Sequence, residues 1–81
     1  MIYSNVLEAI GHTPMIRLSK IVPKGSADVL VKYEGVNIGG SIKTRTAYNM
    51  ICDAEEKGII NSNTIIVEPT SGNQGIGLAL I

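Results

Sequence analysis

The chain has 81 residues, and its seven Lys and Arg balance its seven Asp and Glu, so the formal net charge is zero. This balance argues against a nucleic-acid partner and against a membrane surface as a partner. No apolar run is long enough to cross a bilayer, and a hydrophobic fraction of 44% favours a globular fold. A single cysteine and a single histidine argue against an internal disulfide and a metal site. One lone thiol also fits a reducing compartment, which predicts a cytoplasmic protein.

Helix and strand signals alternate along the chain. Asn5 and Glu8 have the spacing of a capping box at the start of the first helix, and Gly58 follows the longest periodic segment as a stop signal. The expected elements are a helix at 6–10, an extended segment at 15–18, a loop at 21–27, a buried strand within 28–34, a loop at 35–40, a helix at 41–57, a buried strand at 64–67 and an apolar helix from 76.

This order predicts an α/β fold of βαβ units with a parallel sheet. A parallel sheet is normally covered by helices on both faces, and this chain supplies too few helices for that. It also ends at Leu80-Ile81 inside an apolar run that has no stop signal. We therefore expect residues 1–81 to be one incomplete domain, the N-terminal fragment of a larger protein.

The segment at 37–43 joins the loop at 35–40 to the start of the longest predicted helix, at 41–57. Gly39 and Gly40 allow a tight turn, and Ser41 is a good N-cap residue. Lys43 then falls in the first turn, where the helix dipole opposes a cation.

At about 100° per residue, Lys43 shares the apolar face of this helix with Ala47, Met50 and Ala54. Dipole and desolvation would both favour the neutral amine, which can form a Schiff base or act as a base. The alternative is a lysine that reaches the surface from the edge of the helix.

A second loop, at 69–75, leaves a predicted strand and enters the last helix. Ligands of open α/β sheets bind at such strand ends, and the hydroxyls, amides and free backbone N–H groups there could hold a carboxylate or phosphate. The alternative is a polar turn with capping residues. Neither nucleotide motif fits: Ile42 intervenes where the P-loop has Gly before Lys, and the glycines after 71 lack the dinucleotide spacing.

Three segments resemble the cysteine synthase and cystathionine β-synthase family, which comprises pyridoxal-phosphate (PLP) enzymes of fold type II. Residues 37–45 resemble its cofactor-lysine segment, residues 69–75 its substrate-carboxylate loop, and residues 10–18 its N-terminal signature. The three segments occur in the family's order and are distributed along most of the chain, from residue 10 to residue 75.

The resemblance implies that Lys43 binds PLP covalently and later moves the substrate's Cα proton, and that Asn73 hydrogen-bonds the ring oxygen of the cofactor. It implies that the substrate carboxylate is held by Thr70, Ser71, Gly72 and Gln74. The implied enzyme is a β-replacing transferase or lyase that makes cysteine from O-acetylserine, an activated serine, and sulfide. It implies a homodimer for the full-length protein, whose phosphate and pyridine-nitrogen contacts lie beyond this chain, so that the chain alone is expected to be inactive.

The chain departs from the family's usual residues at three of these positions. Ile38 stands where Pro is usual, Thr44 where Asp is usual, and Gln74 where Thr is common. Gln74 keeps open a cystathionine β-synthase-like or other β-eliminating lyase, with a thiol in place of sulfide. A third alternative is a non-catalytic truncated fragment.

Overall fold

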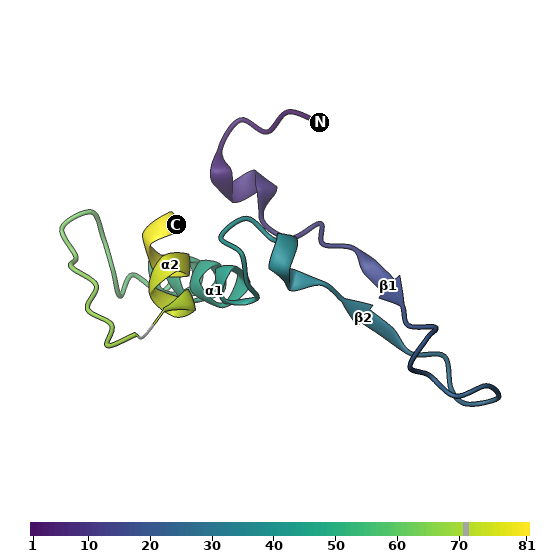
Figure 1. Cartoon of the computed structure of the whole chain (residues 1–81). Helices are drawn as coiled ribbons and strands as arrows, with labels where there is room; N and C mark the ends of the chain where they lie inside the picture. The colour runs from purple at the N-terminus through teal and green to yellow at the C-terminus, as the bar shows by residue number, and fades with distance from the viewer. Residues whose placement is uncertain (71) are drawn as a thin grey trace.

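The computed structural model describes residues 1–70 and 72–81. The elements in chain order are the 3₁₀ helix η1 (Val6–Ala9), the strands β1 (Met15–Arg17) and β2 (Leu30–Lys32), the 3₁₀ helix η2 (Glu34–Val36), and the helices α1 (Lys43–Glu56) and α2 (Asn73–Leu80). Figure 1 shows the β1–β2 hairpin projecting from one side of the α1–α2 pair. Among the described residues, no helix is long and apolar enough to cross a membrane.

The first predicted helix is confirmed as η1, and its cap follows the expected spacing. The Asn5 side-chain oxygen accepts hydrogen bonds from the backbone N–H of Leu7 at 2.9 Å and of Glu8 at 3.2 Å. Glu8 reaches back toward the start of the turn, where its carboxylate accepts the N–H of Ser4 at 3.0 Å. In a capping box the Glu side chain usually accepts the N–H of the N-cap residue, here Asn5, so this bond goes to the residue before it.

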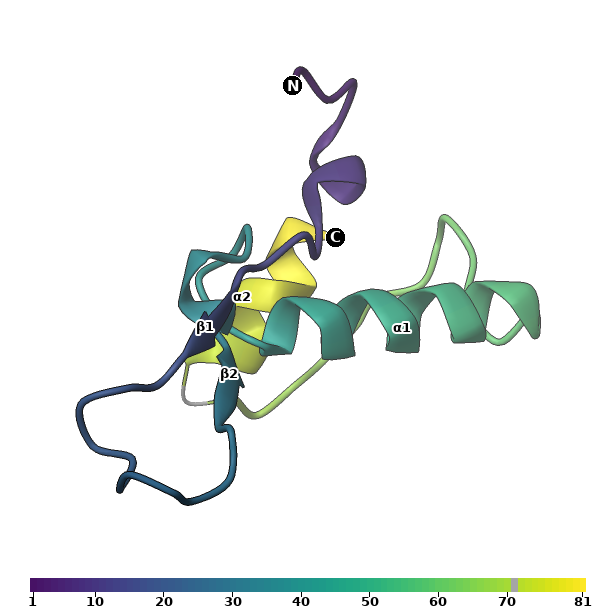
Figure 2. The ribbon, with the colours of Figure 1, turned by 90° about the vertical axis from the view of Figure 1, so that its right-hand side faces the viewer.

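The predicted extended segments form an antiparallel hairpin, with Met15 opposite Lys32 and Arg17 opposite Leu30. The connection at 18–29 contains no helix, so it returns the chain beside itself instead of carrying it across to a parallel position (Figure 2). Both strands are exposed along their length. The expectation of a buried strand in 28–34 is therefore wrong for the described residues.

The expected βαβ pairing through 64–67 is also not seen among the described residues. This segment has no strand partner there, and Ile65 and Val67 are 86% and 85% exposed. A β-branched run becomes a strand only when a neighbour receives its backbone hydrogen bonds. Here β2 is paired with β1, and the segment has no such neighbour.

Helix α1 confirms the best-marked sequence prediction, with its start two residues later than expected. The Ser41 hydroxyl oxygen accepts the backbone N–H of Lys43 at 3.1 Å, but Ser41 lies one residue before the N-cap, which is Ile42. At the other end, Gly58 has a φ of 72°, and the N–H of Ile59 bonds to the carbonyl of Ala54 at 2.9 Å. This is the Schellman ending that a glycine stop signal predicts.

The core lies where α2 crosses α1. Ala47 is fully buried, and Gly77 of α2 is buried against the first turn of α1. A Cβ atom at Gly77 would lie 2.8 Å from the backbone oxygen of Lys43 and 3.1 Å from the Cβ of Ala47. Small residues on both helices thus allow close contact, which places Gly77, in the second half of α2, against the first turn of α1.

Candidate functional site

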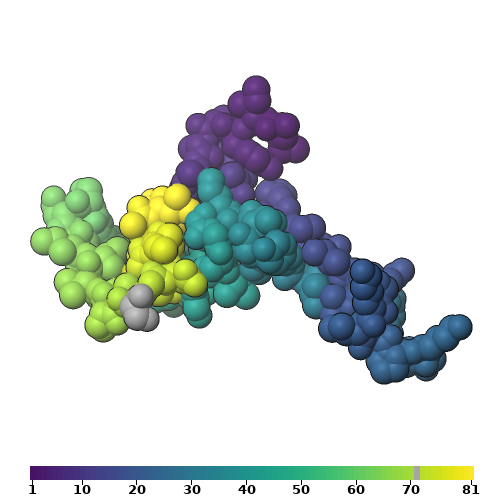
Figure 3. All heavy atoms as spheres, viewed as in Figure 1, coloured from purple at the N-terminus to yellow at the C-terminus, as the bar shows by residue number. Residues whose placement is uncertain are grey.

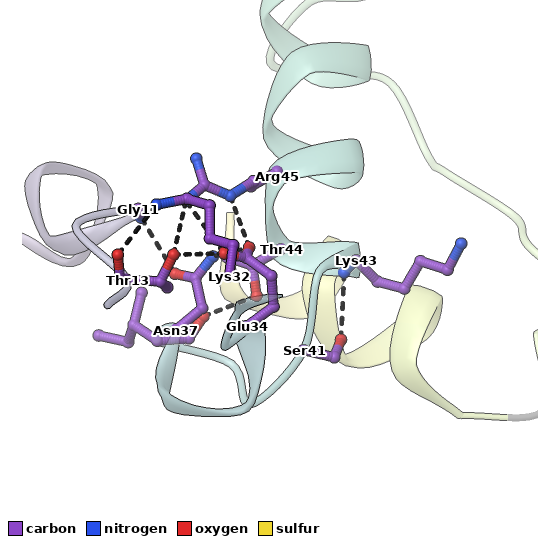
Figure 4. A network of polar contacts seen from close by, with 10 residues as sticks. Gly11, Thr13, Lys32, Glu34, Asn37, Ser41, Lys43, Thr44 and Arg45 are labelled. Carbon is purple, nitrogen blue, oxygen red and sulfur yellow. Dashed lines mark hydrogen bonds and ion pairs between the residues drawn. The ribbon is translucent and has the colours of Figure 1, made fainter. Parts of the chain in front are cut away.

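A group of polar side chains anchors the loop that leads to Lys43. We call Thr13, Glu34, Asn37 and Arg45 the Glu34 network (Figure 4). The guanidinium of Arg45 donates to both carboxylate oxygens of Glu34, at 2.5 and 3.2 Å. The same guanidinium donates to the Thr13 hydroxyl at 3.1 Å, and that hydroxyl donates to Glu34. Asn37 donates to Glu34 at 3.2 Å.

The network also reaches the backbone of the N-terminal segment. The side-chain oxygen of Asn37 accepts the N–H of Gly11 at 3.0 Å, and the ammonium of Lys32 donates to the carbonyl of Thr13 at 2.9 Å. Segments near residues 11–13, 32–37 and 45 are thereby tied together. No spacing rule pairs Thr13 with Arg45, so sequence reasoning missed this network.

The Glu34 carboxyl has the largest electrostatic shift in the described chain. The hydrogen bond from Arg45 lowers its pKa from 4.5 to about 2, helped by the bonds from Thr13 and Asn37, while burial opposes the shift. The same pairing raises the pKa of Arg45. The Glu34 side chain is 13% exposed, so its bonds are largely shielded from water.

This shift predicts a pH-dependent stability. A carboxyl whose pKa is lower in the folded state stabilises the protein above its unfolded pKa, and the contribution is lost as the pH falls from about 4.5 toward about 2. We expect Glu34→Gln to lower the thermal midpoint of the protein that carries this chain at pH 7. The difference in thermal midpoint from wild type should shrink below pH ~4.5.

Glu56→Gln, at an exposed position of α1, is the control. A Glu34→Gln difference that stays constant down to pH ~2.5 would contradict the assignment.

Lys43 is exposed, which corrects the expectation that it lies on the buried face of its helix. The buried positions of α1 are Thr44 and Ala47, because α2 packs on that side. Lys43 lies at the edge of this face, and Figure 4 shows its side chain pointing away from the Glu34 network. Met50, also predicted on the buried face, is half exposed. The amine of Lys43 is accordingly accessible to a ligand without any rearrangement of the helix.

The second predicted loop is organised around Thr70. Its hydroxyl oxygen accepts the N–H groups of Gly72 and Gly75, each at 3.2 Å. Helix α2 starts at Asn73, three residues earlier than the helix expected from 76, and its N-cap is Gly72. Asn73 is exposed, and the amide of Gln74 donates to the sulfur of Met50 at 3.8 Å. Ser71, the remaining predicted substrate contact, lies outside the described residues.

A pocket of about 300 Å³ lies beside this loop. Figure 3 shows the atoms of residues 60–68, in green, next to those of α2, in yellow. The pocket is lined by Ile66, Glu68, Thr70, Gly75, Leu78 and Ala79. Of the predicted site residues that the structure describes, only Thr70 lines the pocket. Lys43 lies on the first turn of α1, which Gly77 contacts.

Comparison with known proteins now identifies the class. A family model described as "Pyridoxal-phosphate dependent enzyme" matches residues 6–81. The chain belongs to this family of PLP-dependent enzymes.

Individual relatives agree with this class. The chain is 47% identical over 79 residues to a probable cysteine synthase of Bacillus subtilis. The matched region covers 98% of this chain and 25% of that protein. It is 46% identical over 80 residues to the cystathionine beta-synthase of Dictyostelium discoideum, with coverage of 99% and 16%. The chain therefore spans about a quarter or less of the length of these relatives.

A solved structure gives the fold. The O-acetylserine dependent cystathionine beta-synthase from Helicobacter pylori superposes with a TM-score of 0.90 at 40% identity, covering 99% of this chain and 27% of that one. The fold type II class expected from the sequence is confirmed, although the parallel pairing is not seen among the described residues.

Proposed function

We propose that the protein carrying this chain catalyses a PLP-dependent β-replacement on an activated serine, forming cysteine from O-acetylserine and sulfide. The single observation that carries the proposal is the exposed amine of Lys43 on the first turn of α1, whose backbone is contacted by Gly77 of α2. The relatives described as cysteine synthases and as an O-acetylserine dependent enzyme support this choice of substrates.

The donor set of this chain fits the cofactor. A primary amine is the group that captures an aldehyde, and Lys43 offers one in an exposed place; Asn73 offers an exposed amide from the first turn of α2. When bound, PLP supplies that aldehyde and a ring that stabilises negative charge at the substrate's Cα. We assign Lys43 to hold the cofactor and to move the Cα proton, and Asn73 to hydrogen-bond the cofactor's ring oxygen.

The substrate carboxylate is assigned to the loop before α2, namely to Thr70, Ser71, Gly72 and Gln74. The Thr70 hydroxyl oxygen already accepts two backbone N–H groups. A hydroxyl has two acceptor sites and one hydrogen, so its hydrogen is the part that can donate to a carboxylate. Backbone N–H groups at a helix N-terminus favour an anion in the same place.

A cystathionine β-synthase-like reaction is the second candidate, with a larger thiol in place of sulfide. It is favoured by the relatives that bear that name. It is also favoured by Gln74, a long side chain beside the carboxylate loop whose amide donates to the sulfur of Met50. Comparing turnover of O-acetylserine with sulfide and with a thiol-bearing amino acid separates the two. We further propose a cytoplasmic homodimer.

Borohydride trapping tests the assignment of Lys43. The PLP-loaded protein is reduced, digested and analysed by peptide mass spectrometry. We expect the adduct on Lys43 and not on Lys20, Lys24, Lys32 or Lys57. Of these four, Lys32 and Lys57 are already engaged, with the Thr13 carbonyl and with Asp53. A stable adduct on one of the four instead of Lys43 would overturn the proposed function.

A further inference from the structure

The residue after Lys43 ties the preceding loop to the helix. Thr44 is 1% exposed, and its hydroxyl donates to the backbone carbonyl of Ile38 at 2.6 Å. A buried hydroxyl is costly unless it is hydrogen-bonded, and this bond satisfies it. The loop at 38–42 is thus closed at its base by the side chain of the first turn of α1.

The loop is also packed against Thr44 without spare room. Gly39 has a φ of 94°, and a Cβ atom there would overlap the Thr44 hydroxyl and lie 3.3 Å from a methyl carbon of Leu80 in α2. Within the loop, the N–H of Gly40 bonds to the carbonyl of Asn37 at 2.8 Å. Asn37 itself is 3% exposed and is held in the Glu34 network. Both ends of the loop are therefore fixed.

We propose that Thr44 is a positioning residue for Lys43, acting through its hydrogen bond to Ile38; this inference rests on the proposed role of Lys43. The bond holds the loop whose Ser41 hydroxyl accepts the N–H of Lys43, so it sets the direction in which the lysine leaves the first turn. Ile38 and Thr44 are two positions at which this chain departs from the family's usual residues, and they are the two partners of this one bond. An ionised aspartate has no hydrogen to donate, so it could not make this bond.

The test uses the PLP-loaded protein that carries the chain, with Thr44→Val and Thr44→Ser as a matched pair. Valine keeps the shape and removes the donor, whereas serine keeps the donor. Cofactor affinity is measured from the absorbance of the lysine-bound form, and hydrogen–deuterium exchange is followed at residues 37–42. We expect Thr44→Val to weaken the affinity about three- to tenfold, as the loss of one net hydrogen bond implies, and to speed exchange in this loop alone.

Thr44→Ser should keep cofactor affinity within about twofold of wild type, because its hydroxyl can still donate to the Ile38 carbonyl. Equal cofactor affinity and loop exchange in wild type and Thr44→Val would overturn the inference, and so would a Thr44→Ser variant as weak as Thr44→Val. The proposed function fails separately, if trapping in the wild type finds no adduct on Lys43.

If Thr44→Val folds poorly, the double variant Ile38→Pro/Thr44→Val keeps the inference testable. Asn37 has a ψ of 147°, which suits a residue before proline. Proline at position 38 would restrict the backbone of the loop by fixing φ, in place of the hydrogen bond from the Thr44 hydroxyl. We expect the double variant to recover the affinity to within about threefold of wild type. A folded double variant that remains more than about threefold weaker than wild type would count against the inference.

Discussion

Replacing Lys43 with alanine is expected to abolish covalent attachment of PLP and to lower kcat by at least about 10²–10⁴-fold, the usual contribution of a positioned acid–base group. The side chain is exposed, so truncation leaves no cavity, and the fold should be retained. Absorbance of the lysine-bound cofactor and steady-state turnover measure the two effects. Near-normal turnover in Lys43→Ala would contradict the proposed mechanism.

Lys57→Ala is the matched control for this experiment. Lys57 is exposed at the end of α1 and pairs with Asp53 at 2.9 Å, one helical turn earlier. Exposed pairs of this spacing contribute only about 0.3–0.5 kcal/mol. The control should therefore keep both the cofactor signal and the turnover, which separates loss of a particular amine from a general loss of positive charge.

Gly77→Ala should destabilise the contact between α1 and α2. The added Cβ would lie 2.8 Å from the backbone oxygen of Lys43, an atom that cannot rotate away. Overpacking costs about 1–3 kcal/mol, against about 1 kcal/mol gained in helix propensity. We expect a net loss of up to about 2 kcal/mol in the free energy of unfolding, read from urea denaturation.

The same substitution should weaken cofactor binding, because the backbone of Lys43 must shift to admit the methyl group. As a control, Ile76→Val removes one methyl group at an exposed position of the same helix and should change stability by less than about 0.5 kcal/mol. A Gly77→Ala protein as stable as wild type, with unchanged PLP affinity, would show that the two helices can separate without effect on the lysine.

The sequence predicted the ends of α1 well because local chemistry determines them. Ser41 and Gly58 act through bonds to nearby backbone, and such bonds need no distant partner. The predicted strand at 64–67 is not seen among the described residues, because a β-branched pattern forms a strand only beside a neighbouring strand. The burial of Lys43 was also misjudged, since a helical face shows periodicity but not which neighbour covers it.

The candidate site shows the same division. The segments around Lys43 and Thr70 were found from the sequence, and their chemical roles remain predictions. The Glu34 network was missed because its members come from segments that are distant in the sequence. The sequence shows Thr44 only as a departure from the family's usual Asp. The partner of its hydroxyl could not be predicted, because Ile38 is apolar as a side chain and accepts through its backbone carbonyl.

The Glu34 network also orders events during folding. Thr13 and Arg45 are 32 positions apart, and Thr13 and Glu34 are 21 apart, so these bonds cannot form until the hairpin has closed and α1 has begun. Local helices form in about a microsecond or less, before such long-range contacts. The loop before Lys43 consequently reaches its final shape only after three remote segments have met, so capture of an aldehyde by a correctly directed lysine would mark a late stage of chain assembly.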